Sequence, residues 1–251
     1  MGLLGDGAGA GEKFREFLLS KDFVGIHTPK LISGSSEGGA AVFKLLYNGQ
    51  PACLAQSPQL YKQMAICGGF ERVFEVGPVF RAENSNTHRH LCEFVGLDAE
   101  MEIKEHYFEV CDIIDGLFVS IFKHLTENCK KELETINRQY PFEPLKRYTL
   151  IATVVLPVIL SCYVYYSELK TCEEIISGAQ RIHTPELLAK RATECGIDVS
   201  TISAYIESFS YGAPPHGGFG VGLERVVMLF CALNNIRKTS MFPRDPQRLV
   251  P

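Results

Sequence analysis

The clearest pattern in the chain is a strict alternation of side chains over residues 93–103. One set is apolar: Val95, Leu97, Ala99, Met101 and Ile103. The other set is Phe94, Gly96, Asp98, Glu100 and Glu102. A period of two predicts a β-strand with one face in the core. Carboxylates and an aromatic ring together are unusual on a merely solvated face, so the second face is a candidate binding floor.

A second strand is predicted over residues 76–83, joined to the first by a polar loop at 84–90. The resulting hairpin gathers Arg81, Glu83, His88, Arg89, His90, Phe94 and Asp98. Arginine and histidine side chains around a loop can hold a polyphosphate, and an aromatic ring can stack on a base. The carboxylates point to a divalent metal shared with phosphate, or to an ammonium group. The alternative is a surface hairpin with ordinary ion pairs.

The remaining elements follow from helical spacing and from turn residues. Helices are predicted at 13–19, from 57–58 onward, and at 106–136, 185–195, 199–208 and 223–234. Extended segments are predicted at 23–31, 52–56 and 173–183. Residues 1–12 are glycine-rich and predicted to be disordered, and residues 33–39 form a small-residue loop that carries Glu37.

A second cluster of glycines spans 217–222 and precedes the helix predicted at 223–234. It is not a G-x-G-x-x-G motif, because Leu223 and Arg225 stand where a third glycine would be, and it lacks the Gly-Lys-Ser/Thr of a Walker A loop. Glycines before a helix still permit close approach of a ligand, and Arg225 could add a bidentate phosphate donor. A packing turn with a surface arginine is the alternative.

One apolar segment is unlike the rest of the chain. Residues 148–166 carry no charge, and Pro157 lies in their middle. Three interpretations are open: replacement core strands broken by a turn, an abnormal joint that would not pack, or a membrane span. The proline and the β-branched residues favour strands, and the length is at the lower limit for a span.

Composition narrows the class of protein. The chain has 251 residues, 46% of them hydrophobic, with a formal net charge of −4. It is long enough for one large or two small domains, and it has no overall basic field that would attract nucleic acid. Nine cysteines without a C-x-x-C pair predict reduced thiols, and no basic start precedes an apolar run, so a cytoplasmic location is expected.

Three stretches resemble the signature motifs of class II aminoacyl-tRNA synthetases. Residues 80–83 (FRAE), 87–91 (THRHL) and 93–94 are similar to motif 2, and residues 220–225 (GVGLER) to motif 3. Residues 23–31, with Pro29, resemble motif 1, the dimer motif. The resemblance implies an α+β fold, with an antiparallel sheet flanked by helices, and a homodimer.

Four further stretches resemble the aspartyl-tRNA synthetases of the eukaryotic and archaeal type: residues 36–40, 56–63, 177–183 and 241–246. The resemblance covers residues 13–145 and 172–251, which implies a catalytic domain at 13–251 with an atypical apolar joint at 145–172. Nothing before residue 13 could form the family's anticodon-binding β-barrel. The joint is shorter than the family's stretch there and unlike it, so the central sheet is expected to lack a part.

The resemblance assigns roles residue by residue. It implies ATP contacts for Arg81, Glu83, Arg89, His90, Phe94, Glu174, Gly222 and Arg225. Arg81 would be the catalytic residue at the α-phosphate. Aspartate would be bound by Glu37, Gln59, Lys62 and Arg181, and Mg²⁺ by Glu174 and Ser177. Because Lys62 and Arg181 would pair with the side-chain carboxylate, asparagine, which lacks that charge, would be poorly matched.

The implied activity is ATP-dependent formation of aspartyl-adenylate, followed by transfer to the acceptor end of tRNA(Asp). Catalysis would come mainly from positioning and charge stabilisation, without a protein nucleophile. Two alternatives remain open: an inactive synthetase-like module that dimerises or binds ATP, and a free-standing enzyme that adenylates aspartate for amide synthesis. The retained arginines favour activity, and the shortened joint favours the inactive module.

Overall fold

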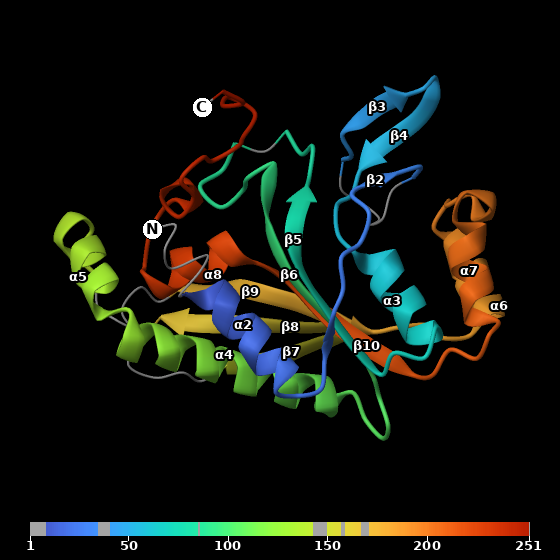
Figure 1. Ribbon diagram of the computed structural model, residues 1–251, viewed down its shortest axis with the longest axis horizontal. Coiled ribbons are helices and arrows are strands. Elements are labelled where there is room, and N and C mark those ends of the chain that lie inside the picture. The colour runs from blue at the N-terminus through green and yellow to red at the C-terminus, as the bar shows by residue number, and fades with distance from the viewer. Residues whose placement is uncertain are drawn as a thin grey trace.

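The computed structural model describes residues 9–34, 41–84, 86–142, 150–156, 159–166 and 171–250, with the backbone alone between 150 and 174. Its centre is a seven-stranded sheet in the order β1-β5-β6-β10-β9-β8-β7 (Figure 1). These strands are β1 (Val24–Gly25), β5 (Arg72–Phe80), β6 (Glu93–Glu102), β7 (Leu150–Leu156), β8 (Ile159–Tyr166), β9 (Thr171–Gln180) and β10 (His216–Gly222). Only the β1–β5 pair among them is parallel. The predicted α+β fold with an antiparallel sheet is confirmed.

Helices α2 (Ala10–Leu19) and α4 (Phe108–Asn128) lie side by side along one face of the sheet (Figure 1), and α8 (Leu223–Phe230) packs beside α2 against the central strands β6, β9 and β10. The apolar set of β6 points into this layer, where Leu97 and Ala99 are buried against α4 residues such as Ile114 and Leu117. Burial of this apolar face is the main stabilising contribution to the fold.

The other elements surround the opposite face of the sheet and its ends. Helix α3 (Gln59–Cys67) packs on β5 and β6, and α6 (Pro185–Glu194), η1 (Val199–Ile202) and α7 (Ser203–Phe209) lie beyond it (Figure 1). A separate three-stranded sheet has the order β2-β4-β3, from β2 (Leu31–Ile32), β4 (Gln50–Leu54) and β3 (Lys44–Tyr47). Helix α5 (Lys130–Gln139) follows α4, and η2 (Ile236–Lys238) follows α8.

Several predicted boundaries are wrong. The helix expected at 106–136 is two helices, because Cys129 leaves helical geometry between α4 and α5. Helix α2 begins at Ala10, so residues 10–12 are helical and not disordered; Ala10 is buried in the core, which explains the early start. Helix α8 ends at Phe230, since Ala232 has a φ of 48°. Strand β5 ends at Phe80, before Glu83.

The cluster of glycines forms strand β10, not a turn. A Cβ at Gly218 would lie 2.2 Å from the carbonyl oxygen of Ala99 and 2.3 Å from Oε2 of Glu100. A Cβ at Gly220 would lie 2.9 Å from Oδ1 of Asp98. Glycine is therefore required at position 218, where a Cβ would overlap a backbone oxygen of β6, and a Cβ at position 220 would crowd the carboxylate of Asp98.

The apolar segment forms strands β7 and β8, which pair antiparallel, and β8 pairs with β9. This is the backbone arrangement that the interpretation as replacement strands expects. Its side chains lie outside the described residues. Within the part of the chain that the structure describes, no helix is long and apolar enough to cross a membrane.

Substitution of Gly218 by alanine tests the requirement for glycine in β10. The added Cβ overlaps a backbone oxygen, so we expect the free energy of unfolding to fall by about 2–3 kcal/mol in urea denaturation. Gly34→Ala is the control, because a Cβ there meets no described atom within 4 Å. Equal stability of the two variants would contradict this account of the strand.

Candidate active site

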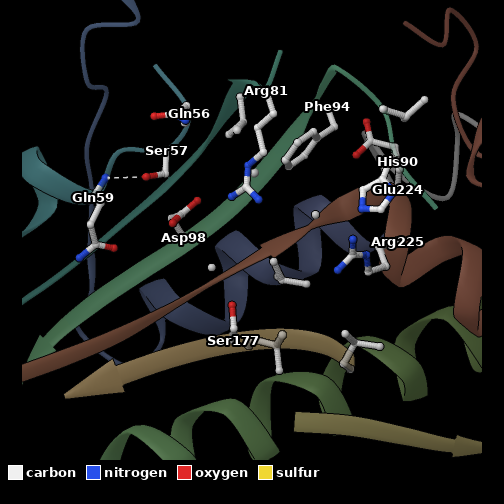
Figure 2. Close-up of a pocket in the computed structure, with 18 of the residues that line it drawn as sticks. Gln56, Ser57, Gln59, Arg81, His90, Phe94, Asp98, Ser177, Glu224 and Arg225 are labelled. Atoms are coloured by element: carbon white, nitrogen blue, oxygen red, sulfur yellow. Dashed lines mark hydrogen bonds between the residues drawn. The ribbon is translucent and has the colours of Figure 1, made fainter. Parts of the chain in front are cut away.

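A cavity of about 410 Å³ opens between β5, β6, β9, β10 and the start of α8 (Figure 2). Ten of the predicted site residues line it: Gln59, Arg81, Glu83, Arg89, His90, Phe94, Ser177, Arg181, Gly222 and Arg225. They come from segments spread over more than 160 positions of the chain. The fold therefore brings motifs that are distant in sequence to one enclosed volume.

The hairpin supplies one wall of the cavity. Val79 pairs with Phe94 in the β5–β6 register, so Arg81 leaves β5 beside the start of β6. The guanidinium carbon of Arg81 lies 5.6 Å from the centroid of the Phe94 ring, within the range of a cation–π contact. Figure 2 shows this guanidinium pointing into the cavity. A cationic donor and an aromatic face are thus presented together.

His90 lies in the same wall, next to the cationic residues of the site. Burial lowers its pKa, and the nearby Arg225 and Arg89 lower it further, although Glu83 acts in the opposite direction. The imidazole is therefore neutral at pH 7. It can donate or accept one hydrogen bond without adding positive charge to the cavity.

The start of α8 supplies the facing wall. Both oxygens of Glu224 accept a hydrogen bond from the backbone N–H of Val95, at 3.2 Å each, which ties the first turn of α8 to β6. Arg225 points from this turn into the cavity (Figure 2). A Cβ at Gly222 would lie 3.5 Å from the Phe94 ring, so the backbone there passes close to the aromatic face.

Asp98 and Arg181 form the floor of the cavity, and with Lys62 and Glu100 beneath them they make a network of four charged side chains. Nζ of Lys62 lies 3.1 Å from Oδ1 of Asp98 and 3.4 Å from Oε2 of Glu100. Arg181 binds both oxygens of Glu100, with Nε at 2.9 Å and Nη2 at 3.2 Å. Glu100 and Lys62 are 0% and 1% exposed. Two acids of β6 are thus neutralised by a base from α3 and a base that follows β9.

Glu100 and Arg181 stabilise each other's charged forms. Burial raises the pKa of Glu100, but the adjacent Arg181 and Lys62 outweigh it and hold the pKa below its ordinary value. For Arg181, burial lowers the pKa, and the paired Glu100 reverses this and raises it. Both shifts favour the charged forms, as expected for a buried pair with good geometry.

Neutral side chains extend the network away from the cavity. Nη2 of Arg181 donates to Oε1 of Gln59 at 3.2 Å, and Nε2 of Gln59 donates to Oε1 of Gln63 at 2.7 Å. Gln63 in turn contacts Nε2 of His216 at 3.0 Å, while Nδ1 of His216 faces the carbonyl of Pro214 at 2.7 Å. Burial lowers the pKa of His216, so it is neutral and donates from Nδ1 to the carbonyl. Its role here is to hold Gln63.

Three predicted site residues are not among the described residues that line the cavity. Lys62 lies beneath the floor, where Nζ also donates to the carbonyls of Ala99 and Phe219. Glu37 lies outside the described residues, and so does the side chain of Glu174. A register shift between β8 and β9 pairs Cys162 with Ile176 and Tyr163 with Glu174. By register, position 174 therefore falls on the same face of the sheet as Ser177.

Several lining or supporting residues had no predicted role in the site. The cavity is also lined by Gln56, Ser57, Glu224 and Asp98, while Gln63 and Glu100 support its floor; of these, Asp98 and Glu100 had been placed on the candidate binding floor without a role. Asp98 and Glu100 had a visible signal, since they are acidic residues on a face whose alternation is otherwise regular. Ser57 was predicted to cap the helix that follows it, but the N-cap of α3 is Pro58; Oγ of Ser57 accepts a hydrogen bond from the N–H of Gln59 at 3.3 Å.

The described side chains were compared with the ligand groups that a metal ion needs. Among them there is no group of three or more His, Cys, Asp or Glu that could hold a metal ion.

Seven cysteines have described side chains, and all seven are free thiols. Burial raises the pKa of Cys231 to about 12, and it raises the pKa of Cys53, Cys92 and Cys129 as well. These four behave as small apolar residues, as predicted.

Comparison with known proteins agrees with the geometry. A family model described as class II tRNA synthetases (D, K and N) matches residues 9–155 and 165–246. A cytoplasmic aspartate–tRNA ligase of Arabidopsis thaliana is 58% identical over 298 residues, covering 95% of this chain and 53% of that protein. The cytoplasmic aspartate–tRNA ligase of Homo sapiens is 47% identical and covers 95% of this chain and 59% of that protein.

Solved structures show the same likeness. A putative aspartyl-tRNA synthetase from Leishmania major matches with a TM-score of 0.81 and 40% identity, over 96% of this chain and 64% of that one. An asparaginyl-tRNA synthetase from Pyrococcus horikoshii, complexed with asparaginyl-adenylate, matches with a TM-score of 0.78 and 29% identity, over 96% of this chain and 68% of that one.

The relatives are longer than this chain. It spans about half the length of the curated Arabidopsis thaliana relatives that it matches. The matched stretch of 298 residues also exceeds the 251 residues of the chain, so the relative has residues where this chain has none. The family match is interrupted between residues 155 and 165, inside the predicted joint at 145–172.

Glu100→Gln tests the charge network. The change leaves two buried cations with a single acid, so we expect the free energy of unfolding at pH 7 to fall by about 3 kcal/mol or more. Because the folded pKa of Glu100 is lowered, its contribution is fully present above the unfolded value near 4.5 and is lost as the pH falls through the folded pKa. The difference between wild type and variant, measured in urea at pH 7 and pH 4, should therefore shrink at the lower pH.

Glu102→Gln is the matched control, because Glu102 lies on the same face of β6 but pairs with the exposed Lys104. An exposed pair of this kind is screened by solvent and contributes little to stability. Equal losses in the two variants, or a difference that grows at pH 4, would show that Glu100 is not held as a buried anion.

Proposed function

The chain belongs to the class II tRNA synthetases (D, K and N), and from this premise we propose that it activates L-aspartate with ATP and transfers it to the acceptor end of tRNA(Asp). The observation that carries the proposal is the single cavity that joins the motif 2 hairpin, the start of α8 and the charged floor. The matched relatives named aspartate–tRNA ligases support the choice of amino acid.

ATP would occupy the end of the cavity between the hairpin and α8. The Phe94 ring and Arg225 offer two faces for adenine, and Glu83 offers an acceptor for its amino group. Arg81 would bind the α-phosphate, while Arg89 and Arg225 would hold the outer phosphates and His90 would contact ATP beside them. Glu174, Ser177 and Gly222 complete the predicted nucleotide site. The physical support is the convergence of arginines on a cavity with an aromatic wall.

Aspartate would occupy the end above the charged floor. Arg181 lines the cavity and presents a cation for the side-chain carboxylate, and Asp98 presents an anion suited to the substrate ammonium. Lys62 would act from beneath by adding positive potential, and Gln59 would orient Arg181. Glu37 is the remaining predicted contact. Asparagine lacks the second carboxylate, so it would leave the buried cation less well compensated.

In the proposed reaction, an oxygen of the aspartate α-carboxylate attacks the α-phosphorus of ATP, and the bond to the leaving pyrophosphate breaks in line. Arg81 would hold the α-phosphate and stabilise the charge that develops on its oxygens. The floor would hold the attacking carboxylate in place, and no side chain forms a covalent bond. Mg²⁺ bound by Glu174 and Ser177 would neutralise phosphate charge; carboxylate and hydroxyl oxygens suit this hard cation.

The proposed cellular location and oligomeric state rest on the relatives and on the sequence motifs. The two curated relatives described above are named cytoplasmic, which supports a cytoplasmic location for this chain. The resemblance of residues 23–31 to the dimer motif supports a homodimer. With a net charge of −4, contact with tRNA would depend on local basic side chains.

A second candidate is an inactive synthetase-like module that still dimerises or binds ATP. The observation in its favour is the shortened joint, at which the family match is interrupted. The two candidates share the nucleotide end of the cavity and differ in whether aspartate is activated.

Exchange of pyrophosphate into ATP distinguishes them. We expect wild-type protein to catalyse exchange with aspartate and not with asparagine. Removal of the Arg81 guanidinium in Arg81→Ala should lower the rate by about 100-fold or more, because a preorganised charge at the reacting phosphate is lost. Arg191→Ala is the control, since Arg191 forms an exposed ion pair on α6. Absence of exchange by a folded wild-type protein would favour the inactive module.

A further inference from the structure

One arginine joins two segments of the chain that lie about 150 positions apart. Arg237, in η2, donates from Nη1 to the carbonyl oxygen of Thr87 at 2.9 Å and from Nη2 to Oδ1 of Asn86 at 2.8 Å. Its Nε donates to Oδ2 of Asp245 at 2.6 Å. A single planar guanidinium therefore holds the loop at 86–92, which we call the hairpin loop, to the segment at 236–248, which we call the C-terminal segment.

Asp245 fixes the orientation of this guanidinium. It is 4% exposed, and its other oxygen accepts a hydrogen bond from the N–H of Gln247 at 2.7 Å. The hydrogen bonds from Arg237 and Gln247 lower the pKa of Asp245. The backbone N–H of Arg237 also donates a hydrogen bond to Oδ1 of Asn235 at 3.0 Å. Contacts with residues near it in the sequence therefore orient the Arg237 side chain toward the hairpin loop.

Two backbone hydrogen bonds accompany the side-chain contacts. The N–H of Ile236 donates to the carbonyl of His88 at 2.7 Å, and the N–H of Cys92 donates to the carbonyl of Arg244 at 2.9 Å. The C-terminal segment therefore holds the hairpin loop near both of its ends. Between these points lie Arg89 and His90, which line the cavity.

Thr87 transmits the contact to these two residues. Its carbonyl is held by Arg237, while its hydroxyl contacts Nδ1 of His90 and accepts from the N–H of Arg89 at 3.4 Å. Displacement of Thr87 would therefore move the turn from which Arg89 and His90 reach into the cavity. The guanidinium of Arg237 itself does not line the cavity.

We propose that Arg237 is a positioning residue for nucleotide binding, which holds the hairpin loop so that Arg89 and His90 face the phosphates of ATP. The inference rests on the proposed function for the identity of the nucleotide. It deepens that function by extending the ATP site to a residue of the C-terminal segment. Lysine cannot replace arginine here, because one ammonium cannot reach three acceptors spread around a planar fork.

The test is Arg237→Lys, which keeps the charge and loses the fork. In aspartate-dependent pyrophosphate exchange we expect the KM for ATP to rise about tenfold, equivalent to about 1.4 kcal/mol, while the KM for aspartate changes less than about twofold. Asp245→Asn should raise the KM for ATP in the same direction and by less. Arg191→Lys, an exposed arginine of α6, is the control and should leave both constants unchanged.

Hydrogen exchange of the free protein gives a readout that does not depend on activity. In Arg237→Lys, amides of residues 86–92 should exchange faster than in wild type, with the rest of the chain unchanged. If the loop amides exchange hydrogen faster in the variant but the wild type catalyses no pyrophosphate exchange, the positioning contact is supported and the proposed function is not. Unchanged loop exchange, an unchanged KM for ATP in active protein, or a loss confined to kcat would each overturn the inference.

Discussion

The pairing of four charged side chains at the floor of the cavity determines how the site is built. Lys62, Asp98 and Glu100 are buried, and each ion would be strongly unfavourable there without its partners, so the network holds only when Arg181 completes it. These residues come from α3, β6 and the segment after β9. Their pairing therefore fixes how the helix and the strands are placed around the cavity.

The neighbouring strand follows from the same constraint. Carboxylates that project from β6 toward β10 need space, and only glycine at positions 218 and 220 leaves it. The backbone oxygen of Ala99 adds to this requirement at position 218, so the glycines of β10 follow from the close packing of the neighbouring strand. The start of α8 then lies against β6 through Glu224, and this contact sets the place of Arg225. The charged floor and the wall formed by the start of α8 are therefore both attached to β6.

Much of this arrangement could be predicted from the sequence, where local patterns are strong. The alternation over residues 93–103 led to strand β6, and helical spacing led to a helix where α4 lies, because periodicity reports directly on burial. The motif residues led to one cavity. The strand character of β10 could not be predicted, since glycine has a low intrinsic preference for strands and its reason lies in side chains of β6. The break at Cys129 likewise has no local signal of the proline or glycine kind.

The contact between Arg237 and the hairpin loop shows the same limit. The side chain lies about 150 positions from its acceptors, and neither segment has a pattern that indicates the other. By contrast, the shortened joint was visible in the sequence as a change of composition, and the interrupted family match falls within it. The nucleotide wall, the charged floor and the C-terminal segment are built from residues outside that joint.

If one cavity binds adenylate and aspartate together despite the shortened joint, the protein should bind a stable sulfamoyl analogue of aspartyl-adenylate, and calorimetric titration with this analogue and its asparaginyl counterpart measures that binding. We expect one site per chain and binding of the aspartyl analogue at least about tenfold tighter, because the second carboxylate meets Arg181. Equal affinity for the two analogues, or no binding by the folded protein, would contradict this expectation.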